Sequence, residues 1–224
     1  MKPNIIQKLE NQKKNYLHIY KLLIHLRTNK FKIMRKNILS VALTLVFGFS
    51  AVANTIDDDR KEVNTEESTV AWKAYKVTGS HNGTINLQSG ALMFDGDKLT
   101  GGEFTVDMTS INTTDLQGES KDNLDGHLKS ADFFGVEKHT TSSLVFTTVE
   151  PSGKNSYNVT GDLTIKGITK PVTFDVSIYG SKATATLKVD RAEYDVRYGS
   201  GSFFDNLGDK TIYDEFDLVV DLAF

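Results

Sequence analysis

The stretch Ser156 to Tyr179, SYNVTGDLTIKGITKPVTFDVSIY, consists of two alternating segments separated by Lys166-Gly167. Apolar residues share one face of the first segment at Tyr157, Val159, Leu163 and Ile165, and one face of the second at Ile168, Val172, Phe174, Val176 and Ile178. Alternation with a period of two is typical of half-buried antiparallel strands, and a glycine in the connection favours a tight hairpin turn. This stretch therefore predicts a β-hairpin.

The same alternation recurs after Ser68 and predicts an all-β domain over residues 68–224. It is clearest at the C-terminus, where one face carries Phe216, Leu218, Val220, Leu222 and Phe224. Between His81 and Phe94 we expect a hairpin that turns at Gln88-Ser89-Gly90. Alternation stops in the segment 116–134, which predicts a short helical insertion over one end of the domain. About seven to nine strands are typical of a barrel or a sandwich, and their spacing does not distinguish the two.

Residues 34–53 have the layout of a secretory signal peptide. A basic start at Met34-Arg35-Lys36 precedes an apolar run over 38–49 and the small-x-small sequence Ala51-Val52-Ala53. The run is short for a membrane span, which needs roughly 20 apolar residues. We therefore favour cleavage after Ala53 over an uncleaved anchor, and expect a periplasmic or secreted protein.

Two further segments flank this signal. Residues 1–33 do not fit a signal peptide, and we favour translation from Met34; the alternative is a basic amphipathic helix on an anionic membrane, with Ile19, Leu22, Leu23 and Leu26 at helical spacing. Residues 54–67 are polar and charged, which predicts a flexible linker.

Composition excludes several classes of function. The chain has no cysteine, which excludes disulfides, cysteine-ligated zinc and thiol nucleophiles. Residues 54–224 carry 16 Lys and Arg against 28 Asp and Glu, a net charge of −12. A protein this acidic is poorly suited to nucleic acid, because binding there depends on neutralising phosphates.

No motif for catalysis, metal or cofactor binding stands out. Beyond residue 53 the histidines are His81, His127 and His139, with no short His-x-x-x-His spacing and no Gly-x-Ser-x-Gly sequence. Acidic pairs are plentiful, but none is singled out from ordinary turn and surface residues. We therefore predict neither an enzyme nor a bound cofactor.

Several separate motifs follow one another along the chain: SHNGTI at 80–85, FTVDMTSI at 104–111, GHLKSADFF at 126–134, GDLTIKGITKPV at 161–172, and Val189-Asp190-Arg191 followed by Tyr194. In this order they resemble the YceI-like family of polyisoprenoid-binding proteins. The resemblance implies an eight-stranded antiparallel, lipocalin-like barrel with a helical segment against it. It also implies a bound isoprenoid lipid or quinone, and a homodimer.

In such a barrel the inward-facing residues either fill the lumen or line a tunnel. The residues that we expect to contact a ligand are Phe104, Val106, Met108, Phe146, Leu163, Ile165, Phe174, Val176, Leu187, Phe216, Leu218 and Val220. An isoprenoid chain moved from water into such a tunnel would gain roughly 0.8 kcal/mol per buried CH₂-sized group.

A second group of residues could lie at the cavity mouth near a ligand head group, namely His81, His127, Arg191, Tyr194 and Arg197. A guanidinium binds phosphate well, but Arg191 and Arg197 could instead pair with Asp190, Glu193 or Asp195 and hold a loop. Asp195 replaces a glycine that is characteristic of the family. A carboxylate at the rim would disfavour a pyrophosphate head more than a neutral quinone or alcohol.

The sequence thus predicts a secreted carrier that holds an isoprenoid chain in its lumen, with transient membrane contact. One alternative is a stress-related or surface interaction module whose barrel is filled. A weaker alternative is an enzyme acting on a small amphiphile through His81 or His127.

Overall fold

The computed structural model describes residues 58–224, so the predicted signal peptide and the segment 1–33 lie outside the described residues. The strands are β1 (Asp58–Glu62), β2 (Thr69–Lys76), β3 (Gly79–Asp95), β4 (Lys98–Thr113), β5 (Thr141–Pro151), β6 (Ser156–Ile165), β7 (Ile168–Tyr179), β8 (Lys182–Asp190) and β9 (Ile212–Ala223). The helices of this part of the chain are α2 (Gly118–Lys129) and the short 3₁₀ turns η1 (Arg191–Tyr194) and η2 (Gly208–Lys210).

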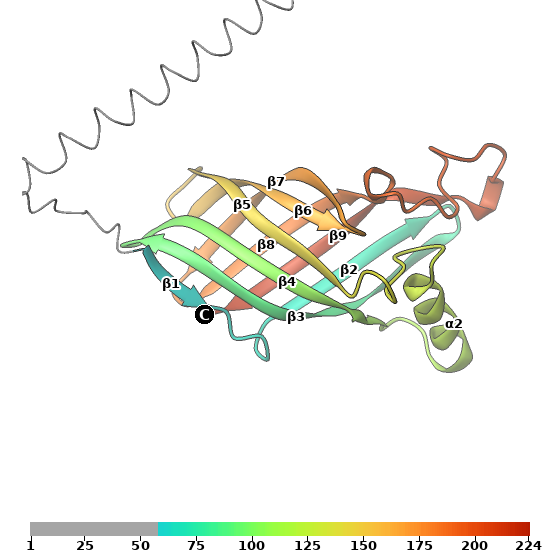
Figure 1. Cartoon of the computed structure of the whole chain (residues 1–224), viewed down its shortest axis with the longest axis horizontal. Coiled ribbons are helices and arrows are strands. Elements are labelled where there is room, and N and C mark those ends of the chain that lie inside the picture. Colours follow the sequence, from blue (N-terminus) through green and yellow to red (C-terminus); the bar gives the residue numbers. More distant parts are fainter. Residues whose placement is uncertain (1–57) are drawn as a thin grey trace, which may run out of the picture. The chain divides into compact units, whose positions relative to one another are not determined.

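Eight of these strands close into a barrel (Figure 1). Each neighbour in the order β3-β2-β9-β8-β7-β6-β5-β4 pairs antiparallel, and β4 pairs back to β3. The ends of the domain meet where β2 pairs with β9, for example at Thr69 and Asp221. The predicted all-β, eight-stranded antiparallel barrel with a helical insertion is confirmed.

The hairpin predicted from the segment 156–179 is present as β6 and β7. Ile165 pairs with Ile168, and the two residues between them, Lys166 and Gly167, both have positive φ, at 52° and 74°. Two positive φ angles are the signature of the type I′ turn, whose twist matches that of the strands. On the outer face, Thr160 and Thr173 share a hydrogen bond of 2.9 Å.

The hairpin predicted between His81 and Phe94 is wrong, because this segment is the single strand β3. The Ser89 region forms a bulge instead of a turn, since the register with β4 shifts between Leu87 and Ser89. Gly90 allows the Phe104 ring to lie close to the backbone of β3, because a Cβ at this position would be only 2.6 Å from Phe104 Cδ1. A glycine that admits an aromatic side chain looks, in sequence, like a glycine that turns the chain.

The segment 54–67, predicted to be a flexible linker, contains the strand β1. All five of its residues pair with β3, and Val63 beyond it is buried and donates its N–H to the Gly90 carbonyl at 2.8 Å. β1 pairs with β3 alone and therefore lies at an edge. Charged side chains are common on edge strands, where they discourage pairing with other chains, so charge alone did not argue against a strand here.

The helical insertion lies at one end of the barrel. Leu128 of α2, with Phe133 and Val136 after it, packs in one cluster with Ile85 and Met108 of the barrel strands. Asp125 of α2 accepts a hydrogen bond of 2.8 Å from the buried Thr113 N–H at the end of β4. Within residues 58–224, no helix is both long and apolar enough to cross a bilayer.

Candidate functional site

The barrel interior contains a cavity rather than a solid core. Its volume is about 180 Å³, measured as the space open to the centre of a water molecule, and each strand from β2 to β9 contributes to its wall. Since one water needs roughly 10–15 Å³ on this measure, the cavity has room for about a dozen. The alternative of a barrel filled by its own side chains is therefore wrong.

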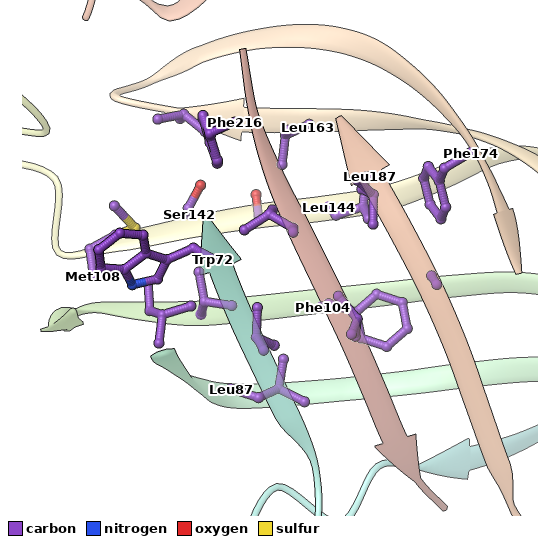
Figure 2. Close-up of a pocket in the computed structure, with 18 of the residues that line it drawn as sticks. Trp72, Leu87, Phe104, Met108, Ser142, Leu144, Leu163, Phe174, Leu187 and Phe216 are labelled. Carbon is purple, nitrogen blue, oxygen red and sulfur yellow. The ribbon is translucent and has the colours of Figure 1, made fainter. Parts of the chain in front are cut away.

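The structure places all twelve residues predicted to face the lumen on the cavity wall. In Figure 2, Phe104, Phe174 and Leu187 point into a common interior space from β4, β7 and β8. That these residues bind a ligand stays a prediction. Further wall residues that the prediction did not name include Trp72, Leu87, Leu144, Phe133 and Phe134.

Three aromatic rings line one part of the wall. The ring centroids of Phe104 and Phe146 lie 5.5 Å apart, and those of Phe146 and Phe174 lie 5.7 Å apart. Gly102 makes room for them, because a Cβ there would lie 2.7 Å from Phe146 Cε2. Tilted ring pairs at these distances are favourable beyond the area they bury, so this wall presents a firm apolar surface.

Polar residues on the wall are few, and two of them, Ser142 and Arg191, are bonded to other parts of the protein. Ser142 donates its hydroxyl hydrogen to the Thr164 carbonyl of the neighbouring strand. Arg191 is the charged residue among those that line the cavity, and its side chain is only 3% exposed. It donates to the backbone carbonyls of Tyr213 (3.2 Å), Val196 (2.9 Å), Tyr198 (2.9 Å) and Ile212 (3.0 Å).

The charge of Arg191 is compensated by the protein itself. Its Nη2 lies 3.3 Å from Asp214 Oδ1, and the Phe133 ring centroid is 5.4 Å from its Cζ. Burial lowers the pKa of the guanidinium, while the charge of Asp214 acts in the opposite direction. With four carbonyls and one carboxylate around its five N–H groups, Arg191 holds a loop, although its partner is Asp214 rather than the three acidic residues expected.

The two histidines predicted at the mouth do not line the cavity. His81 Nδ1 lies 2.8 Å from Asp115 Oδ2, in a partly exposed pair beside the end of β4. The His127 ring packs edge-on against Tyr198, with centroids 4.3 Å apart. In the part of the chain that the structure describes, no three His, Asp or Glu side chains are grouped as metal ligands would be. An enzyme that uses these histidines on a ligand in the lumen has no support from their positions.

Tyr194 and Arg197 also lie away from the cavity wall. Tyr194 is fully buried, and this burial raises the pKa of its hydroxyl to about 12. Arg197 is exposed and pairs with the Asp195 carboxylate, as the alternative interpretation expected. Asp195 does not line the cavity either, and its effect on an anionic head group stays a prediction.

The backbone at Asp195 has a conformation that favours glycine. It is left-handed, with φ of 59° and ψ of 33°, where Asp195 ends the turn η1. Most residues with a Cβ lose roughly 1–2 kcal/mol in this conformation, and aspartate is among those that tolerate it best.

We expect Asp195→Gly to be more stable than Asp195→Ala by about 1 kcal/mol, because the two variants lose the same carboxylate and differ only by the Cβ at positive φ. The measurement is equilibrium unfolding in urea. Equal midpoints for the two variants would contradict this account of the position.

The closed barrel around an apolar cavity places the chain among β-barrel proteins built around an internal space. Residues 61–224 match the family model of the YceI-like domain, and the chain belongs to the YceI-like family. It is 34% identical over 112 residues to a UPF0312 protein of Pseudomonas putida (strain W619), a match covering 50% of this chain and 56% of that protein. The match thus spans little more than half of this curated relative.

Two solved structures share the fold. Burkholderia cenocepacia BcnA is similar with a TM-score of 0.55 and 23% identity, over 72% of this chain and 99% of that one. A polyisoprenoid binding domain from Saccharophagus degradans, described as implicated in plant cell wall breakdown, is similar with a TM-score of 0.51 and 13% identity. That match covers 74% of this chain and 98% of the other.

Proposed function

We propose that this protein binds the apolar chain of an isoprenoid lipid with an uncharged head, a quinone or a polyprenol, in its barrel cavity. It would shield that chain from water and carry it through the periplasm or the secreted space, without converting it chemically. The observation that carries the proposal is the cavity wall, which is apolar on every strand and has one charged residue that is already neutralised. The polyisoprenoid-binding domain that shares the fold supports the same class of ligand.

The wall suits a long hydrocarbon chain for a simple energetic reason. Each CH₂-sized group moved from water into it gains roughly 0.8 kcal/mol, without any need for a polar contact. The loss of freedom on binding opposes this gain, and a pre-formed cavity keeps that cost low because the wall does not have to reorganise.

The state of Arg191 favours an uncharged head group. An anionic phosphate in the cavity would need free donors, because burying an unpaired charge is costly. The guanidinium of Arg191 already donates four hydrogen bonds to carbonyls and forms an ion pair with Asp214, and the wall has no second cation. A quinone or an alcohol escapes this penalty.

The chain carries its own reporter for a binding test. It has one tryptophan, Trp72, and this residue lies on the cavity wall (Figure 2). We expect a quinone with an isoprenoid tail to quench Trp72 fluorescence saturably. A polyprenyl phosphate with a tail of the same length should compete at least about tenfold more weakly, a difference of about 1.4 kcal/mol.

Native mass spectrometry of protein purified from its own host, followed by lipid extraction, identifies the natural ligand. A stoichiometric isoprenoid adduct supports the proposal. Absence of saturable binding by quinone, polyprenol and polyprenyl phosphate would overturn it, and tighter binding of the phosphate would overturn the choice of an uncharged head.

A further inference from the structure

The loop between β8 and β9 exposes an unusual set of aromatic side chains. Figure 1 shows this segment, in red, projecting past the barrel at the end where α2 lies. Three aromatic residues of this loop are exposed, Tyr198 (49%), Phe203 (41%) and Phe204 (50%), and so is Tyr213 (53%) at the start of β9; we call these four residues the aromatic rim. Burial of such side chains in an apolar surrounding is strongly favourable, so their exposure at one end of the domain points to a partner surface.

The backbone that carries the aromatic rim is held firmly. Phe203 and Phe204 both donate their N–H groups to the carbonyl of Ser200, a fully buried residue. Ser202 donates its hydroxyl hydrogen to Asp214 Oδ2 at 2.6 Å, on the other limb of the loop. The exposure of the rim is therefore a feature of an ordered loop and not of a loose one.

The aromatic rim is continuous with the cavity. Tyr213 and its neighbour Ile212 line the cavity wall, and Ile212 donates its N–H to the Gly199 carbonyl across the loop at 2.8 Å. Arg191, which lies on the wall, donates to the carbonyls of both Tyr198 and Tyr213. A chain that enters the cavity at this end would pass the rim.

The charge of the loop indicates what kind of surface it meets. The loop between β8 and β9, residues 191–211, contains three basic residues, Arg191, Arg197 and Lys210. It contains four acidic residues, Glu193, Asp195, Asp205 and Asp209, so it carries no positive net charge. The domain as a whole is strongly acidic. Coulombic attraction to anionic lipid therefore does not drive membrane binding by this loop. Aromatic side chains partition favourably into the interface of a bilayer without net charge.

We propose that the aromatic rim inserts into the interface of a bilayer of zwitterionic lipid and presents the α2 end of the cavity to the membrane. This inference rests on the proposed function, because it supplies the route by which a water-insoluble lipid reaches the lumen. A second copy of the chain is the competing occupant of the same surface, and the experiment below distinguishes the two.

The test compares Phe203→Ser/Phe204→Ser with Tyr179→Ser, all produced in the native host. Tyr179 is 61% exposed and lies at the β7–β8 turn, so this control removes a ring that is more exposed than either phenylalanine and lies outside the loop. Co-sedimentation with phosphatidylcholine vesicles measures the partition coefficient. The double variant should lose at least about tenfold in partitioning, and the control should match the wild type.

Further measurements separate this proposal from the proposed function. Trp72 quenching by a quinone added from ethanol should be unchanged in the double variant, because Phe203 and Phe204 are not on the cavity wall. Failure of the wild type to bind a quinone while the rim still binds vesicles would overturn the proposed function alone. Three results would overturn membrane docking. The control could lose as much vesicle partitioning as the double variant, or the wild type could partition only onto anionic lipid. The third is that the wild type is a dimer and the double variant a monomer.

Discussion

Replacement of Arg191 by methionine is expected to lower the free energy of unfolding by about 3–5 kcal/mol. Methionine keeps much of the length and packing of the side chain but removes every donor. Four backbone carbonyls would lose this donor, and the Asp214 carboxylate would lose its cationic partner in a largely buried place. Breaking one side of a buried ion pair typically has an effect of this size.

Arg197→Met is the matched control for this prediction. Arg197 is on the same loop, but its side chain is 59% exposed and its pair with Asp195 lies at the surface. Surface pairs contribute about 0–1 kcal/mol, so urea unfolding should change little. Similar losses in the two variants would show that Arg191 is not the residue that holds the loop.

Replacement of Ala185 by phenylalanine is expected to block ligand binding while leaving the fold intact. Ala185 lies on the cavity wall in β8, opposite Val176 on one neighbouring strand and Val220 on the other. The phenyl ring that this change adds fills part of the open cavity and contacts the side chains of the surrounding wall. Affinity for an isoprenoid quinone should fall at least about tenfold, or about 1.4 kcal/mol, with the unfolding free energy changed by about 1 kcal/mol or less.

Thr186→Phe provides the control, because Thr186 is the next residue of β8 and its side chain is exposed on the outer face. The same ring is added one position along the strand, where it cannot reach the lumen. Quinone titration of Trp72 fluorescence compares the two variants. Unchanged affinity in Ala185→Phe would mean that the ligand lies outside the cavity.

The barrel and most of its inner wall could be predicted because they obey the strand period. Leu163, Phe174 and Phe216 alternate with polar neighbours, so their common face follows from the sequence once the strands are recognised. Trp72, Leu144 and Leu222 are in the same phase on their strands and could have been found in the same way. Phe133 and Phe134 follow the helix in a non-periodic segment, and no pattern predicted that they reach the wall.

The prediction failed where an interaction joins parts of the chain that are distant or irregular. The partners of Arg191 lie in a loop with no periodicity, so sequence proximity suggested acidic neighbours such as Glu193 instead of Asp214. Ser89-Gly90 resembled a turn because the need of Phe104 for space is visible only in three dimensions. The charged strand β1 resembled a linker because an edge strand need not be apolar.

The pairing of β2 with β9 joins the two described strands of the barrel that lie farthest apart in sequence. The β6–β7 hairpin joins residues three positions apart, such as Ile165 and Ile168, whereas closure joins Thr69 to Asp221. Pairing between distant segments is slow, because the chain loses much freedom before those contacts form. We therefore expect closure to be a late step of folding, and it requires β9. Until β9 is in place, the apolar interior faces water, and the nascent domain is at its most prone to aggregate.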